Sequence, residues 1–134
     1  ALGAHEVIDH TREDVAARVR ELTGRKGVEI VVEHVGGPVF EAAVRSLARD
    51  GRLVTCGATI GAKVTLDLNL LFGRHLSLLG SWMGRRDDLL AALEHVASGA
   101  IAPVVDEVLP LAEARRAHAR IEAREHFGKV VLVP

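Results

Sequence analysis

The sequence predicts an α/β fold built on a parallel sheet, and three observations support this prediction. An apolar, β-branched run, Val28–Val35, leads directly into the pair Gly36-Gly37. Apolar residues then recur at helical spacing after Pro38, a residue that suits the first turn of a helix. Two further apolar runs, Leu53–Gly57 and Leu76–Gly80, also end on glycine. A strand covered on both faces gives such a near-continuous apolar run, so the pattern indicates parallel strands joined by helical crossovers.

The other expected elements of the first half are shorter or less distinct. A brief strand is expected at Glu6–Asp9, and an amphipathic helix follows over Val15–Leu22. Residues Thr11–Asp14 resemble a capping box at the start of this helix. The helix after Pro38 is expected to run to about Arg49. The alternation in Val64–Leu70 fits a strand, although its last residues equally fit a helical turn.

The second half contains two helical patterns and two extended segments. Asp87-Asp88 favours the N-terminus of a helix, which Gly99 is expected to end. An extended segment is expected at Pro103–Val108, and a helical face follows over Leu111–Ile121. A last strand is expected at Lys129–Val133, directly after a glycine.

Composition limits the possible functions. The chain has 134 residues, 49% of them hydrophobic, which is enough for one domain with a sizeable core. A formal net charge of -1 gives no electrostatic footprint for nucleic acid or for an anionic membrane. No apolar run approaches the roughly 18 residues of a membrane span. The single cysteine, Cys56, fits a reducing compartment, and a cytoplasmic protein is expected.

Two further features concern metals and the extent of the chain. The seven histidines show no spacing typical of zinc ligands, so no metal site is expected within this stretch. The opening Ala1-Leu2-Gly3-Ala4 reads as the end of a helix in mid-structure. The chain is therefore expected to be the C-terminal part of a longer protein.

The glycine-containing strand ends form the candidate binding site. Ligands of open α/β sheets bind beyond the carboxyl ends of the strands. Three such ends are expected, at Val35–Gly37, Cys56–Ala58 and Gly80–Trp82. Glycine there would let backbone groups approach a flat ligand, although glycines also simply end strands in many α/β proteins. Cys56 is interpreted as a small packed residue and not as a nucleophile, because no basic motif lies beside it.

Short motifs also occur in one order along essentially the whole chain, namely Leu2-Gly3-Ala4, Leu22-Thr23-Gly24, Val35-Gly36-Gly37, Gly51–Gly57, Leu76–Ser81, Leu109-Pro110-Leu111 and Phe127–Leu132. This ordered set resembles the C-terminal half of a medium-chain dehydrogenase/reductase, the superfamily of zinc-type alcohol dehydrogenases and quinone reductases. The resemblance implies the C-terminal part of a doubly wound, Rossmann-type parallel sheet whose first two strands are missing. It assigns residues 1–84 to the dinucleotide-binding domain and residues 85–134 to a segment that returns to the catalytic domain.

The resemblance also implies cofactor-binding residues, but no catalytic residue and no metal ligand. Val35 and Gly36 would border the adenosine side of NAD or NADP. Cys56, Gly57 and Ala58 would lie along the nicotinamide end, and Gly80, Ser81 and Trp82 would offer backbone groups to the carboxamide. Arg124 and Lys129 match positions where basic residues reach the cofactor phosphates.

By the same resemblance, the whole protein would transfer hydride between a nicotinamide and a small alcohol or carbonyl, or a quinone or enone. This stretch alone is expected to be inactive, and any zinc would be bound elsewhere in the parent. His10 stands where the reductase branch often has a tyrosine, which leaves the choice between NAD and NADP open. A homodimer through the edge strand at residues 75–80 is expected. The alternatives are a non-catalytic nucleotide-binding domain and a methyltransferase-like doubly wound domain.

Overall fold

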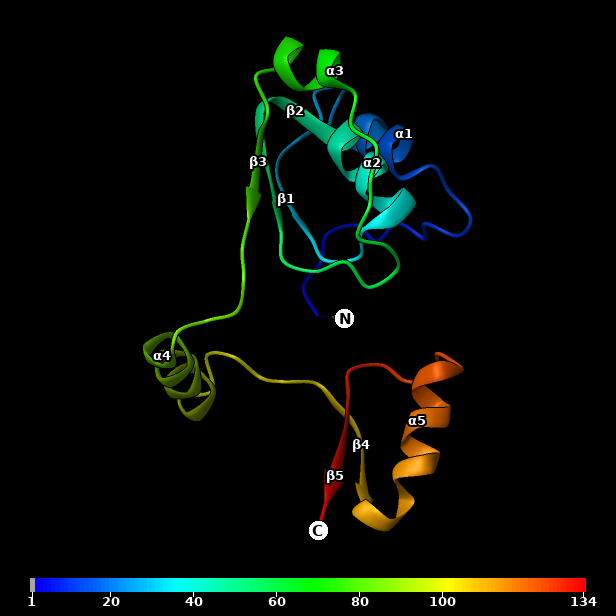
Figure 1. Ribbon diagram of the computed structural model, residues 1–134, viewed down its shortest axis with the longest axis vertical. Helices are drawn as coiled ribbons and strands as arrows, with labels where there is room; N and C mark the ends of the chain where they lie inside the picture. Colours follow the sequence, from blue (N-terminus) through cyan, green and yellow to red (C-terminus); the bar gives the residue numbers. More distant parts are fainter. Residues whose placement is uncertain (1) are drawn as a thin grey trace. The chain divides into compact units, whose positions relative to one another are not determined.

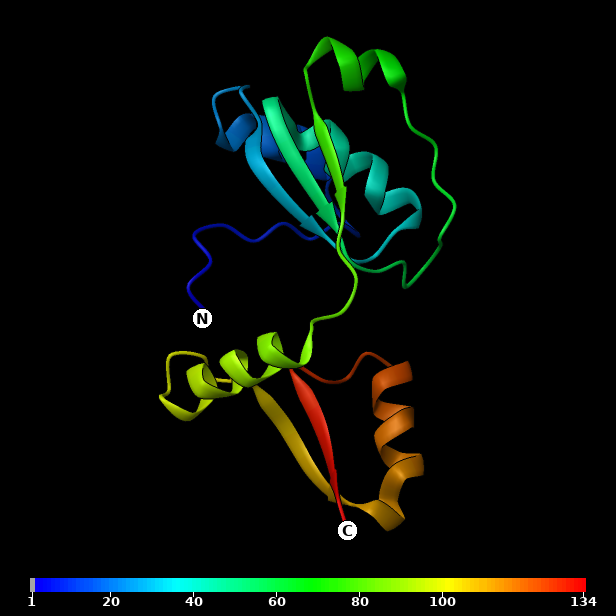
Figure 2. The same cartoon turned by 60° about the vertical axis from the view of Figure 1, so that its left-hand side comes forward.

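The computed structural model describes residues 2–134 and shows two compact units, Ala1–Met83 and Gly84–Pro134. Figures 1 and 2 show the elements of each unit from two sides. No helix within residues 2–134 combines the length and the apolarity needed to cross a membrane.

The first unit is a three-stranded parallel sheet with helices packed on it, which confirms the predicted α/β class. The strands lie in the order β1, β2, β3, with bounds Val28–Glu33, Leu47–Thr55 and Ser77–Gly80. The helices are α1 (Val15–Leu22), α2 (Gly37–Ser46) and the short α3 (Leu68–Gly73). Helix α2 contacts both β1 and β2, and α1 packs against α2 (Figure 2).

The core of this unit lies between α2 and one face of the sheet. Phe40 and Val44 of α2 pack with Leu47 and Leu53 of β2, and all four are buried. Val31 of β1 packs against the same cluster. Burying one such side chain contributes about 1.5–3 kcal/mol, so this cluster fixes α2 on the sheet.

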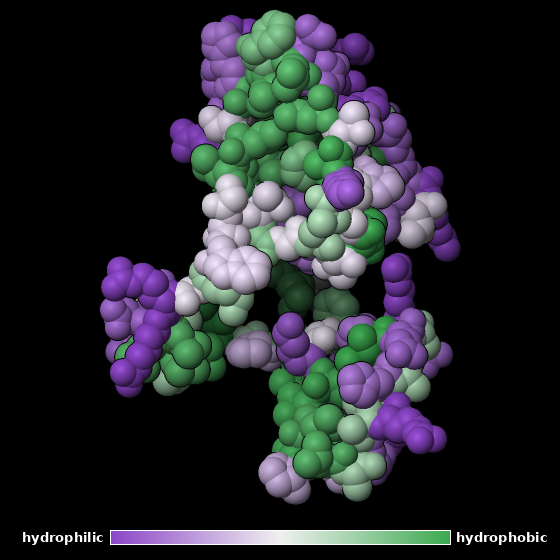
Figure 3. Space-filling model, in the orientation of Figure 1, coloured by the Kyte–Doolittle hydropathy of each residue, from purple (hydrophilic) through white to green (hydrophobic). Residues whose placement is uncertain are grey.

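Within the described residues of this unit, no helix covers the other face of the sheet, and its apolar side chains are exposed. Ile30 and Val32 of β1 are 64% and 70% exposed, and Leu79 of β3 is 48% exposed. Val32, Val54 and Leu79 lie in one row, because their strands pair in register. Figure 3 shows the apolar surface that results.

The bounds predicted for α1 are confirmed, but the capping box predicted at residues 11–14 does not form, and the strand predicted before it is absent. Asp14 is the residue that caps α1, because its side chain accepts a hydrogen bond of 2.9 Å from the N–H of Ala17. Thr11 instead donates through its hydroxyl, at 2.6 Å, and through its N–H to Asp9, which lowers the pKa of Asp9. Residues 6–9 form no strand, since no neighbouring strand within residues 2–134 pairs with them.

Two further boundaries differ from the prediction. Helix α2 ends at Ser46 and not near Arg49, because Leu47 already pairs with Val28 as the first residue of β2. The alternation over residues 64–70 gives no strand. The helical alternative is correct instead, since α3 begins after Asp67, whose side chain accepts a hydrogen bond of 2.8 Å from the N–H of Asn69.

The second unit contains a parallel pair of strands, β4 (Val105–Pro110) and β5 (Lys129–Val133). The connection between them runs through a 3-10 turn, Leu111–Glu113, and helix α5, Ala114–Glu122 (Figure 1). Helix α4 spans Arg86–Ala97. These elements confirm the helices and the last strand predicted from periodicity, with boundaries shifted by a few residues.

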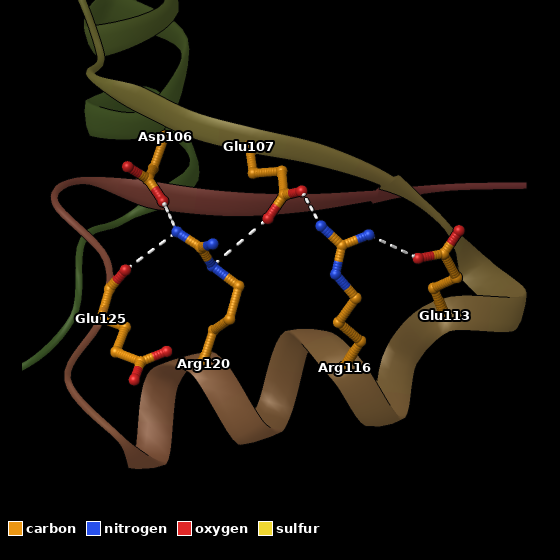
Figure 4. A network of polar contacts seen from close by, with 6 residues as sticks. All are labelled: Asp106, Glu107, Glu113, Arg116, Arg120 and Glu125. Atoms are coloured by element: carbon orange, nitrogen blue, oxygen red, sulfur yellow. Dashed lines mark hydrogen bonds and ion pairs between the residues drawn. The ribbon is translucent and has the colours of Figure 1, made fainter.

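Arginine–carboxylate contacts tie α5 to β4 (Figure 4). Arg120 lies 2.8 Å from Asp106 and 3.3 Å from Glu107, and the second contact is an ion pair without hydrogen-bond geometry. Arg116 contacts Glu107 and, at 2.8 Å, Glu113. The hydrogen bond to Glu113 and the charge of Glu107 raise the pKa of Arg116.

Candidate cofactor site

The carboxyl ends of β1, β2 and β3 meet at one edge of the sheet. Glu33, Thr55 and Gly80, which end the three strands, pair across the sheet in register. Beyond them, the N–H of Cys56 donates to the carbonyl of Glu33 at 3.1 Å. The N–H of Ser81 donates to the carbonyl of Thr55 at 2.9 Å. The structure therefore brings together the strand ends that the sequence singled out.

The turn after β1 is fixed to the loop that follows β2. The N–H of Ile60 donates to the carbonyl of Val35 at 2.9 Å, and the N–H of Gly37 donates to the carbonyl of Gly61 at 3.0 Å. The hydroxyl of Thr59 donates to the carbonyl of His34 at 3.1 Å. These hydrogen bonds join the turn at residues 34–37 to the loop at residues 56–61. The two segments together are called the wall of the site.

The glycines of this wall have an internal reason that the sequence interpretation did not include. Gly36 has a φ of +75°, and a Cβ there would lie 2.2 Å from the carbonyl oxygen of Gly61. A Cβ at Gly57 would lie 2.8 Å from the carbonyl oxygen of His34. Both glycines are required because the chain approaches its own backbone. At Gly80 no atom lies within 4 Å of an added Cβ, so this position is open.

The loop after β2 presents free hydrogen-bond donors. In the part of the chain that the structure describes, the N–H groups of Gly57 and Ala58 donate to no protein atom, and both residues are exposed. Donors of this kind suit the oxygens of a carboxamide, a hydroxyl or a phosphate. A nicotinamide dinucleotide carries all three groups, so the wall fits such a cofactor.

Cys56 and Trp82 are both exposed at this edge. The interpretation of Cys56 as a packed residue is wrong, because it lies one position beyond the end of β2, where the sheet no longer covers it. Its thiol lies 3.9 Å from the carbonyl oxygen of Glu33. Trp82, two residues beyond β3, is 87% exposed and is the only tryptophan in the chain.

Glu33 is a site residue that sequence reasoning missed. Its side chain lies at the end of β1, and the residue is only 4% exposed. One carboxylate oxygen accepts hydrogen bonds from the N–H groups of Val35, at 2.5 Å, and Gly36, at 2.7 Å. The available signal was an acidic residue inside an apolar run, directly before a glycine turn.

The remaining predicted residues lie apart from this wall in the sequence. His10 lines a hollow of about 420 Å³ with the starts of α1 and α2. Arg124 follows α5 and Lys129 begins β5, so both belong to the second unit. Their assignment to the cofactor phosphates stays a prediction.

The residues present do not form a zinc site. Within residues 2–134, no group of three or more His, Cys, Asp or Glu side chains is placed to hold a metal ion.

Parallel strand ends with exposed backbone donors are typical of open α/β proteins that bind a ligand beyond the carboxyl ends of their strands. Residues 2–132 match the family model described as "Zinc-binding dehydrogenase". The chain therefore belongs to the zinc-binding dehydrogenase family, which confirms the resemblance to the C-terminal half of medium-chain dehydrogenase/reductases.

Individual relatives agree with this assignment. The chain is 33% identical to quinone oxidoreductase-like protein 2 of Bos taurus, over 97% of this chain and 40% of the relative. It matches the crystal structure of an NAD-dependent alcohol dehydrogenase with 42% identity and a TM-score of 0.87, over 99% of this chain and 39% of that one. It also matches a mycobacterial protein complexed with NADPH, with 35% identity and a TM-score of 0.76, over 98% of this chain and 44% of that one.

The chain spans about two fifths of the length of these proteins, with shares of 39% to 44%. The structural neighbours are matched over their C-terminal part, which confirms the predicted position within a doubly wound fold.

Proposed function

We propose that this chain is the cofactor-binding portion of an NAD(P)-dependent oxidoreductase. The whole protein would transfer hydride between a nicotinamide and an alcohol or carbonyl, or between a nicotinamide and a quinone or enone. The observation that carries the proposal is the edge where β1, β2 and β3 end together. The wall at this edge has free N–H donors at Gly57 and Ala58. Relatives described as NAD-dependent and as complexed with NADPH support a nicotinamide cofactor.

The wall and the segment after β3 have proposed roles toward that cofactor. The turn at Val35-Gly36 borders the adenosine side. The N–H groups of Gly57 and Ala58, beside Cys56, bind the nicotinamide end, and Gly80–Trp82 offer backbone groups to the carboxamide. When bound, the cofactor would donate or accept the hydride, and this chain would supply position and hydrogen bonds. Arg124 and Lys129 supply positive charge to the phosphates.

The experiment is a fluorescence titration of the intact protein with NADH and with NADPH. Trp82 lies at the proposed nicotinamide end, so binding is expected to quench tryptophan emission in a saturable manner. The Trp82→Phe variant is the control, because it should lose the part of the signal that arises at this site. The absence of binding to either nucleotide would contradict the proposal.

The substrate class is tested by turnover of the same protein. The family includes proteins described as alcohol dehydrogenases and as quinone oxidoreductases, so alcohols, aldehydes, quinones and enones form the panel. Binding of a nucleotide without turnover of any of these compounds would favour the non-catalytic alternative. Membership of the dehydrogenase family overturns the methyltransferase-like alternative.

We also propose that the intact protein forms a homodimer through β3. This strand lies at the edge of the sheet, and its outer side pairs with no strand in the described residues. An unpaired edge favours association with a second copy. Light scattering should report a dimer, and amide exchange should show protection along β3. A monomer, or a dimer with rapidly exchanging β3 amides, would contradict this.

A further inference from the structure

Among the described residues, Glu33 is the one acidic side chain that the first unit buries. The residue is 4% exposed, whereas the other glutamate of β1, Glu29, is exposed. Burying a carboxylate is costly unless hydrogen bonds replace its water. Two donors do so here, namely the N–H groups of Val35 and Gly36, which share one oxygen. The Thr55 hydroxyl lies 3.3 Å from the other oxygen and also 3.3 Å from the carbonyl oxygen of Gly57, so its one proton serves either acceptor.

These contacts are directed at the turn and not at solvent. The carboxylate of Glu33 reaches forward along the chain, so that Val35 and Gly36 are held over the end of β1. The contact with Thr55 ties the same group to the end of β2. Because the residue is buried and one of its oxygens already accepts two N–H hydrogen bonds, Glu33 acts on the turn and not on a ligand directly.

We infer that Glu33 is a positioning residue for cofactor binding, which holds the Val35-Gly36 turn in the shape that borders the adenosine side. The inference rests on the proposed function for its cofactor role. Gly36 has a φ of +75°, and its N–H is fixed by Glu33. The carbonyl of Val35 is fixed by Ile60. Glu33 and the loop after β2 therefore hold the two sides of this turn.

The test compares variants of the intact protein in two measurements, which are amide exchange at Val35 and Gly36 without ligand, and the Kd for the nucleotide that binds. Glu33→Met keeps a similar side-chain volume but removes the acceptors. It should speed exchange at both amides and raise the Kd, each by about tenfold, which is the effect of about 1.4 kcal/mol. Glu33→Gln retains one oxygen and should restore both values to within about threefold.

Two controls separate positioning from general destabilisation. Glu29→Met changes an exposed glutamate of the same strand and should leave both measurements unchanged. Val31→Ala truncates a side chain packed against the core, so it should lower Tm while leaving the Kd within about twofold. If Glu33→Met does not fold, Glu33→Ala replaces it in the same comparison.

Three results would overturn the inference. The first is exchange and Kd at wild-type values in Glu33→Met. The second is a rise in Kd that Val31→Ala reproduces. The third is a rise in Kd that Glu33→Gln fails to reverse. If the wild-type protein binds neither nucleotide, the proposed function fails. Amide exchange still decides whether Glu33 holds the turn, so the two failures are distinguishable.

Discussion

At the scale of single residues, Gly36 combines two constraints. Its φ of +75° is unfavourable for any residue with a Cβ, and that Cβ would lie 2.2 Å from the carbonyl oxygen of Gly61. The same carbonyl accepts the hydrogen bond from Gly37 that joins the turn to the loop. A substitution at Gly36 must therefore move the backbone of the wall.

We predict that Gly36→Ala destabilises the intact protein by roughly 2 kcal/mol or more and weakens nucleotide binding. Gly73→Ala is the matched control, because no atom lies within 4 Å of a Cβ there and φ is not positive. It should change the stability by less than about 1 kcal/mol. Thermal unfolding measures both, and equal effects of the two substitutions would contradict the strain at Gly36.

The sequence predicted that glycines lie at the strand ends, but it did not predict why glycine is needed there. Glycines 36 and 57 were expected to admit a ligand, but their close contacts are with the chain itself. Periodicity places Glu33 in a strand, yet it does not reveal which backbone groups a buried carboxylate will accept. That information depends on the path of the turn, which only the structure provides.

At the scale of elements, the contact between α5 and β4 contains partly buried ion pairs. Arg120 and its partner Asp106 have side chains that are only 31% and 22% exposed. Partly buried ion pairs are screened less than exposed ones, and removing one partner leaves the other without compensation.

We predict that Arg120→Met destabilises the intact protein by about 1–2 kcal/mol, because Asp106 and Glu107 lose a cation. The control is Arg45→Met, whose pair with Glu41 is 4.0 Å long and exposed. This control should change stability by less than about 0.5 kcal/mol. Urea unfolding at low and at moderate salt measures both. An Arg120→Met effect no larger than that of the control would refute this role of the network.

Element boundaries show where local patterns stop being informative. The helix pattern after Pro38 continues in the sequence beyond Ser46, but pairing of Leu47 with Val28 ends the helix there. In the same way, residues 6–9 have strand-forming side chains without a neighbouring strand among the described residues. Tertiary partners decide both cases, and a single sequence does not display them.

At the scale of the whole molecule, the uncovered face of the first sheet exposes apolar side chains. Ile30, Val32 and Leu79 expose apolar side chains on one face. Figure 3 shows apolar surface over this unit. Strands β1 and β3 leave both edges of the sheet unpaired within residues 2–134. Exposed apolar strands of this kind promote association.

We predict that residues 1–134, expressed alone, self-associate. Val32→Thr should reduce the association, because Val32 is 70% exposed, whereas Lys63→Thr, in an exposed loop, should not. Analytical ultracentrifugation measures the distribution of species. A soluble monomer of these residues that unfolds cooperatively would contradict the prediction.

The central claim is that the ends of β1, β2 and β3 form the cofactor-binding face. The most direct measurement is hydrogen–deuterium exchange of the intact protein with and without saturating NADH or NADPH. We predict that the bound nucleotide slows exchange in residues 34–37, 56–61 and 80–82, while exchange in α4 does not change. The claim would be contradicted if a bound nucleotide slowed amide exchange elsewhere in the protein but in none of these three segments.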